Sequence, residues 1–148
     1  MSVKKRFELH QVLNYRLEVE KVRKLEFAAA KREYELASDK LLRVKDTVKA
    51  LQEEFTAKQG QINTIDELQM YADYFARKKE EIKLQQERVE ALDRIMDDKR
   101  NEMLEATKDK KVLESLKDKQ EKAFKLSQEQ KERNFLDEIS IQKKGSEH

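Results

Sequence analysis

Apolar residues recur every three or four positions along two long stretches of this chain. The first stretch contains Tyr34, Ala37, Leu41, Val44, Val48, Leu51 and Phe55. The second contains Leu68, Tyr71, Phe75, Ile82, Val89, Leu92, Met96, Met103, Ala106 and Leu113. This spacing places apolar side chains on one stripe of an α-helix, so each stretch is predicted to form a helix that packs as part of a coiled coil.

Helix-breaking residues are almost absent from the sequence. There is no proline, and Gly60 is the only glycine before residue 145. Because helices tolerate proline and glycine least, their absence permits very long helices. We predict one helix over about residues 7–58, a turn over about 59–65 and a second helix over about 66–141.

The predicted turn carries local signals. Gly60 can adopt the left-handed conformation, with positive φ, that commonly closes a helix. Thr64 and Glu67 have the spacing of a capping box at the start of the second helix. Asp66 brings negative charge to the positive end of that helix dipole.

The two apolar stripes fit one antiparallel register. The residue numbers of opposing positions add up to 126, as for Phe55 with Tyr71 and for Leu51 with Phe75. A constant value describes one continuous seam. The fold is therefore expected to be all-α, an antiparallel two-helix coiled-coil hairpin that forms a single domain over residues 1–148.

Polar residues interrupt this seam at Lys78, Gln85 and Lys99. Long amphipathic side chains can keep their stems on the seam while their polar ends reach solvent, and they disfavour slipped pairings. We expect that role here. The alternative is that these positions keep the hairpin loose enough to bend or to admit a partner.

A second register is predicted near the N-terminus, one residue out of phase with the stripe that begins at Tyr34. Its residues are Val12, Tyr15, Val19 and Val22. The slip is placed across residues 25–30, where three alanines leave room for it. Val12 would then oppose Leu113, and Val22 would oppose Met103. Residues after about 120 remain unpaired, so the second helix is expected to be longer and to overhang at the C-terminus.

Composition supports a thin rod that exposes most of its surface. Of 148 residues, 43% are charged and 7% are aromatic, which is too much charge for a compact globule. The net charge is only +2 and the signs interleave, so we expect no nucleic-acid binding. No apolar run approaches the ~20 residues that span a bilayer, so we expect no direct membrane insertion. The absence of cysteine removes disulfides and thiolate metal sites and favours the cytosol.

Residues suited to catalysis are few and scattered. The two histidines are His10 and the terminal His148, and both are expected to be solvated. Adjacent carboxylates such as Asp97 and Asp98 point about 100° apart on a helix and cannot share a substrate. No phosphate-binding loop, dinucleotide fingerprint, nucleophile elbow or zinc spacing occurs. We predict no enzyme, with no catalytic residues, no cofactor and no metal.

Several motifs carry a family resemblance, and two of them, the N-terminal Arg-Phe run and the C-terminal Leu-Asp-Glu, lie outside the heptad pattern. The motifs are the N-terminal run Lys5-Arg6-Phe7-x-Leu9-x-x-Val12-Leu13-x-x-Arg16 with Glu20, Ala28 and Tyr34, the basic segment from Glu105 to Lys117, the pair Glu129-Gln130, and the close Leu136-Asp137-Glu138-Ile139. Over essentially its whole length the chain resembles the FliJ family of flagellar export proteins, whose fold is the hairpin described above.

The resemblance implies a soluble component of the bacterial flagellar type III export apparatus, with roles in flagellum biogenesis, protein transport, motility and chemotaxis. In this family the coiled coil acts as the central stalk of the hexameric export ATPase. It also contacts the membrane protein of the export gate and assists export chaperones. The resemblance places the protein in the cytoplasm, peripherally associated with the flagellar basal body at the inner membrane. The single register favours a monomer when the protein is free.

Two sets of contact residues are expected from the resemblance. The candidates for the export gate, near the turn end of the hairpin, are Tyr74, Lys78 and Val48. Of these, Tyr74 lies off the seam and is expected to be an exposed aromatic anchor. The candidates for the ATPase ring, near the chain ends, are Lys4, Lys5, Arg6, Phe124, Lys131, Arg133, Phe135, Leu136 and Ile139.

Two alternatives remain open on sequence grounds. One is a related stalk from a virulence-type injection system, which would have a similar shape. The other is an unrelated structural or tethering coiled coil, or a homodimer of long helices. A monomeric mass in solution would exclude the homodimer.

Overall fold

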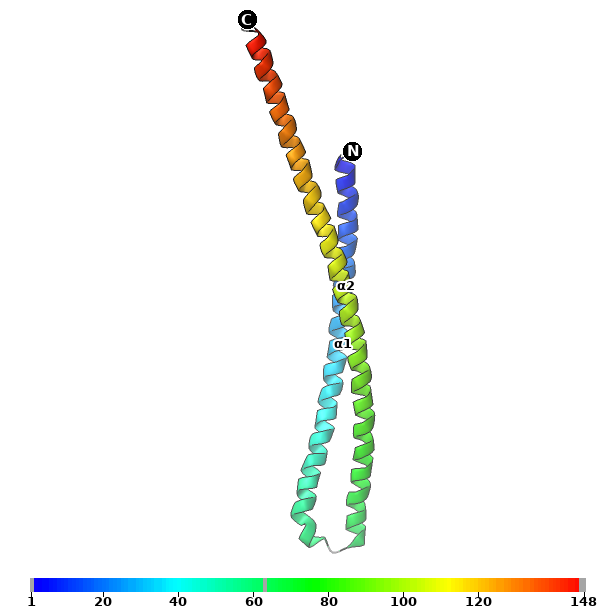
Figure 1. Ribbon diagram of the computed structural model, residues 1–148. Helices are drawn as coiled ribbons and strands as arrows, with labels where there is room; N and C mark the ends of the chain where they lie inside the picture. Colours follow the sequence, from blue (N-terminus) through cyan, green and yellow to red (C-terminus); the bar gives the residue numbers. More distant parts are fainter. Residues whose placement is uncertain (1, 63, 147–148) are drawn as a thin grey trace. The chain divides into compact units, whose positions relative to one another are not determined.

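Two long helices and a short connection account for the architecture. The computed structural model describes residues 2–62 and 64–146, with side chains over 9–62 and 64–145. Helix α1 (Ser2–Lys58) is followed by the 3₁₀ turn η1 (Gln59–Gln61) and by α2 (Ile65–Ser146) (Figure 1). At ~1.5 Å per residue, the 82 residues of α2 extend over roughly 120 Å. The described residues form no strand, so the predicted all-α hairpin is confirmed.

Both helices are longer than predicted. Helix α1 begins at Ser2 rather than near Phe7, and α2 continues to Ser146, past Gly145. A Cβ at Gly145 would meet no atom within 4 Å, so this glycine faces open space. A single glycine costs a helix only about 1 kcal/mol relative to alanine, which does not force the helix to end.

The connection differs from its predicted conformation. Gly60 lies within η1, and none of the described residues has positive φ, so the predicted left-handed closure is wrong. A tightened last turn of 3₁₀ type satisfies helix-end carbonyls without that conformation. One of the two hydrogen bonds of the predicted capping box is present: the backbone N–H of Glu67 donates to the Thr64 hydroxyl at 3.3 Å. Asp66 and Glu67 supply the negative charge in the first turn of α2.

The chain divides into two compact units. Unit 1 comprises residues 1–21 and 104–148, and unit 2 comprises residues 22–103. In unit 2 the predicted register holds. The Phe55 and Tyr71 rings meet edge to face with centroids 5.1 Å apart, and Ala37, Val44 and Met96 are buried.

Polar residues on the unit 2 seam behave in two ways. The Lys99 ammonium reaches the carboxylates of Glu26 at 3.6 Å and Glu102 at 3.4 Å, so its charge leaves the seam as expected. Gln85 does not follow this pattern. Its Oε1 is buried and has no hydrogen-bond partner among the described residues. A buried, unsatisfied amide oxygen costs stability, so this layer is a weak point of the seam.

Unit 1 does not have the predicted second register. Leu13 is 6% exposed, whereas Val12 is 46% exposed, so the seam contains Leu13 and not its neighbour. Tyr15 is also exposed, as is Val22 in unit 2. The three-four step of α1 therefore continues through residues 25–30 without a slip. The seam positions that it reaches, including Arg16 and Glu20, are polar and find charged partners on α2.

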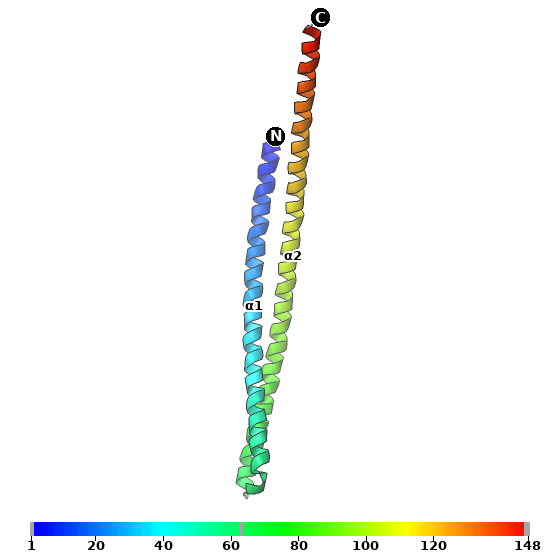
Figure 2. The ribbon, with the colours of Figure 1, turned by 90° about the vertical axis from the view of Figure 1, so that its left-hand side faces the viewer.

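The C-terminal overhang is confirmed as a helical continuation of α2. In the register of unit 1, Ser2 lies opposite residue 124, so the residues that follow have no counterpart on α1. Figures 1 and 2 both show this part of α2, coloured orange to red, running past the N-terminal end of α1. All described side chains from Lys122 to Gly145 are exposed.

Candidate functional sites

An aromatic layer closes the seam of unit 2 next to the turn. Phe55 of α1 packs edge to face against both Tyr71 and Phe75 of α2, with centroid distances of 5.1 and 6.1 Å. Edge-to-face pairs contribute about 0.5–1.5 kcal/mol beyond the burial of their area. The layer therefore holds the two helix ends together beside a connection that has no core of its own.

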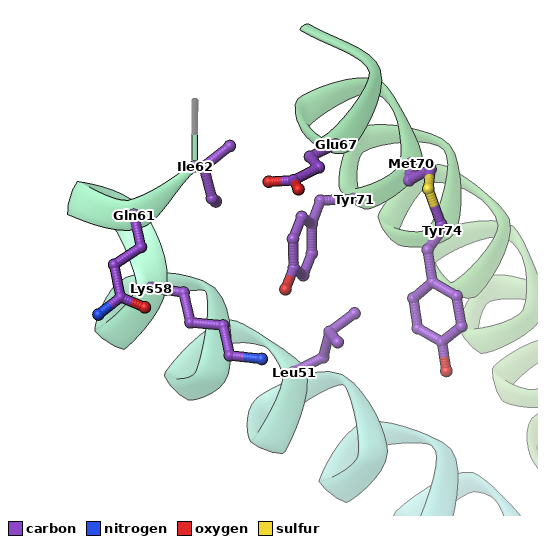
Figure 3. A pocket seen from close by; sticks show the side chains of 8 residues that line it. All are labelled: Leu51, Lys58, Gln61, Ile62, Glu67, Met70, Tyr71 and Tyr74. Atoms are coloured by element: carbon purple, nitrogen blue, oxygen red, sulfur yellow. The ribbon is translucent and has the colours of Figure 1, made fainter. Parts of the chain in front are cut away.

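A hollow of about 660 Å³ lies between this layer and the connection. Its lining combines apolar, aromatic and charged side chains: Leu51, Lys58, Gln61, Ile62, Glu67, Met70, Tyr71 and Tyr74. We call it the turn-end pocket. Figure 3 shows Leu51 and Lys58 facing it from α1, Ile62 from the connection, and Glu67 and Tyr71 from α2.

The cation that lines the turn-end pocket is paired with a carboxylate outside the lining. The Lys58 ammonium lies 2.9 Å from Glu54 Oε1. Hydrogen bonding to Glu54 raises the pKa of Lys58, with smaller contributions from Tyr71 and Glu67. The pocket was not predicted, because Ile62 and Met70 belong to no heptad stripe. Large apolar residues in and beside a turn, where polar residues are the rule, were the signal that could have indicated it.

The structure brings two of the three gate candidates together. The Lys78 ammonium lies 5.5 Å from the centre of the Tyr74 ring and 3.0 Å from Glu81 Oε2. Hydrogen bonding to Glu81 raises the pKa of Lys78, opposed by partial burial, so the ammonium stays charged over the ring. Tyr74 is half-buried rather than fully exposed, and one part of it lines the turn-end pocket. Val48 is half-buried on α1 at the seam.

A buried ion pair crosses the seam of unit 1. The Lys110 ammonium lies 3.0 and 3.1 Å from the two carboxylate oxygens of Glu20, and Glu20 is only 5% exposed. Next to it, the Arg16 guanidinium lies 3.5 Å from Asp109 in a half-exposed pair. A charged layer inside an apolar seam fixes the register, since any slip would leave buried charges without partners.

The same register leaves large apolar side chains on the outside of unit 1. Val12, Tyr15 and Leu17 of α1 are exposed, as are Val112 and Leu116 of α2. Val12 and Tyr15 were predicted as seam residues. Their position on the surface gives the terminal end of the hairpin an apolar component that a solvated rod does not need.

The ring candidates occupy both ends of the chain. Lys4, Lys5 and Arg6 lie in α1, but their side chains are outside the described residues. On the overhang the exposed candidates are Phe124, Lys131, Arg133, Phe135, Leu136 and Ile139. Ile139 lies four residues after Phe135 and three after Leu136, so these side chains share one side of α2, whereas Phe124 lies more than two turns before them.

The described residues were also compared with the requirements of a metal site and of a membrane-spanning helix. They contain no group of three or more His, Asp or Glu side chains arranged to hold a metal ion. None of the described helices contains a segment that is both long and apolar enough to span a bilayer.

The comparison with known families agrees with the resemblance noted in the sequence. The family model of the flagellar FliJ protein matches residues 5–146, nearly the whole chain. No curated protein and no solved structure matches the chain.

Proposed function

Because the chain belongs to the FliJ family of flagellar proteins, we propose that it acts as the central stalk of the hexameric export ATPase and as that enzyme's link to the export gate. Family membership itself makes the protein a component of flagellar type III export. The family is not one of known enzymes, and we assign no catalytic role to any residue.

The overhang is the observation that supports the ring contact best. An isolated helix of about 20 residues is marginal in water, yet α2 continues to Ser146 and exposes Phe135, Leu136 and Ile139. A surrounding protein ring would supply both the missing packing and the partner for these side chains. Lys131 and Arg133, together with the basic start of α1, are suited to acidic loops lining such a ring.

The exposed apolar residues of unit 1 support a ring contact at the same end of the hairpin. Tyr15 and Leu116 lie on the part of the rod that would enter the ring first after the overhang. Aromatic and aliphatic side chains surrounded by charge are typical of interface centres. We therefore place the ring contact on unit 1 as a whole, not on the overhang alone.

The ring proposal is tested by the stimulation of ATP hydrolysis. A chain ending at Lys125 removes only the part of α2 that has no counterpart on α1, so the thermal melting of the hairpin should stay unchanged. We expect this variant to lose its stimulation of the flagellar export ATPase of the same organism. Phe135→Ala with Leu136→Ala should lose part of it, and Leu84→Ala, an exposed change in unit 2, should lose none. Full stimulation by the shortened chain would show that the overhang is not needed and that the ring contact lies elsewhere on the chain.

The gate proposal places the contact at the turn end, around Tyr74, Lys78 and Val48. Tyr74 supplies an aromatic surface that the Lys78 ammonium holds in place, and a rigid aromatic is the usual anchor of a protein interface. Tyr74→Ala should weaken binding to the cytoplasmic region of the gate protein while helicity, measured by circular dichroism, is retained. Unchanged affinity by titration calorimetry would remove Tyr74 from the contact.

Three further assignments rest on the family. We propose that the protein assists export chaperones, that it is a monomer when free, and that it works on the cytoplasmic side of the basal body at the inner membrane. The family match favours a flagellar over an injection-system setting. A pull-down with the flagellar export ATPase of the same organism would distinguish a role in export from an unrelated tethering role.

A further inference from the structure

The turn end of unit 2 is acidic, although the whole chain has a net charge of +2. Between residues 52 and 74 there are five carboxylates and one cation, Lys58. The carboxylates are those of Glu53, Glu54, Asp66, Glu67 and Asp73. Lys58 lies 2.9 Å from Glu54, and five carboxylates against this one cation leave a net charge of −4 on residues 52–74. The next cations on α2 are Arg77, Lys78 and Lys79, about one turn further along, so the negative potential offered to a partner is confined to the tip of the hairpin.

The same end of the hairpin also exposes apolar side chains. Met70 is 72% exposed on α2, and Ile65, at the first residue of that helix, is 82% exposed. Met70 lines the turn-end pocket, together with Ile62 and the ring of Tyr71. Helix starts and turns normally carry polar residues at such positions, so an exposed Met side chain beside a hollow marks a place where another molecule covers it.

Two aromatic side chains of the turn-end pocket contact neighbouring side chains of the hairpin. Tyr71 packs edge to face against Phe55, and the Lys78 ammonium lies over the ring of Tyr74. Side chains that are already packed lose little entropy when a pocket is filled. The flexible thioether of Met70 at its rim can adapt to the shape of what enters.

We propose that the turn-end pocket receives a large apolar side chain from a lysine- or arginine-bearing segment of the export gate. The inference rests on the proposed gate contact and adds the chemistry of the segment that makes it. The apolar side chain enters between Ile62, Met70 and Tyr71. The flanking cations face Glu67 and Asp66 at the start of α2, which also places opposite charges in contact across the rim and speeds association.

The choice of a cationic partner follows from charge and not from the pocket alone. An acidic segment would meet the net negative charge of residues 52–74 at the tip and would be repelled. A second copy of the chain is the competing occupant, because residues 108–125 carry seven lysines against four acids. These lysines could serve as the basic element in a head-to-tail pair.

The experiment measures affinity of the full-length chain for the purified cytoplasmic region of the gate protein, by calorimetry at about 50 mM and about 300 mM salt. Met70→Glu places a charge in the pocket and should weaken binding about tenfold or more, equivalent to roughly 1.4 kcal/mol. Glu67→Lys should weaken it about fivefold and reduce its dependence on salt. The matched controls on the exposed surface of α2, Leu84→Glu and Glu90→Lys, should change affinity less than about twofold.

The results distinguish a failure of the pocket inference from a failure of the proposed gate contact. If the natural chain does not bind the gate at all, the gate proposal and the inference both fail. If it binds and the pocket variants match their controls, the inference fails and the gate contact lies elsewhere. Binding that is insensitive to salt would likewise overturn the cationic segment. A dimer seen by sedimentation in the natural chain and lost in Met70→Glu would assign the pocket to a second copy and overturn the inference.

Discussion

Breaking the buried ion pair of unit 1 should cost far more than breaking an ion pair on the surface. Lys110→Ala removes the cation that reaches both oxygens of the Glu20 carboxylate across the seam, and Glu20 is only 5% exposed. Removing one partner of a fully buried pair costs about 3–5 kcal/mol. The Lys110 side chain is 18% exposed, so some water reaches this layer, and we expect a loss of about 3 kcal/mol in the free energy of unfolding of unit 1.

The double substitution Glu20→Leu with Lys110→Leu should not destabilise the hairpin. Two leucines fill the seam without any cost of desolvating charge, so stability should be unchanged or higher by about 1–4 kcal/mol. Urea denaturation followed by circular dichroism measures both variants. The control is Lys122→Ala, which removes an exposed pair with Asp118 at 3.2 Å and should cost about 0.5 kcal/mol or less. If Lys110→Ala cost no more than this control, the pair would be solvated and our account of the layer would be refuted.

Three other changes test the register and the turn. Leu13→Ala should lower stability by about 2–3 kcal/mol while Val12→Ala changes it by less than about 0.5 kcal/mol, and equal losses in denaturation would restore the slipped register. Gly60→Ala should raise the free energy of unfolding by about 0.4–1 kcal/mol, because φ at Gly60 is not positive and a Cβ there meets no atom within 4 Å. A lower free energy of unfolding would contradict that geometry. Cysteines at Leu51 and Phe75 should form a disulfide within one chain at low concentration, and mainly intermolecular products on a reducing-agent-free gel would point to a dimer.

The part of the fold that could be predicted is the part whose seam is apolar. In unit 2, residues such as Val44, Phe55 and Tyr71 leave one stripe on each helix, and only one antiparallel alignment buries both. The absence of proline permits long helices, and the gap in the apolar step between Phe55 and Leu68 divides them into two. Periodicity of apolar residues is the strongest signal that a sequence holds, and here it is nearly complete.

The register of unit 1 could not be read in this way, because the seam residues there are charged. Val12 and Tyr15 form an apolar stripe that looks like a core, while Glu20 and Lys110 look like surface residues. Only their proximity makes their burial tolerable, and a pair 90 positions apart is invisible to a local pattern. The turn-end pocket escaped prediction for a related reason: it is made by three segments that meet only after folding.

The ion pair also has a consequence for the order in which the protein is made. Phe55 and Tyr71 emerge from the ribosome almost together, but Glu20 must wait for Lys110, 90 residues later. At ~5–20 residues per second, this delay is roughly 5–20 s. During that time the start of α1 has no counterpart on α2. Charged residues on its seam keep the waiting segment hydrated, and the hairpin can close from its turn towards its ends as synthesis proceeds.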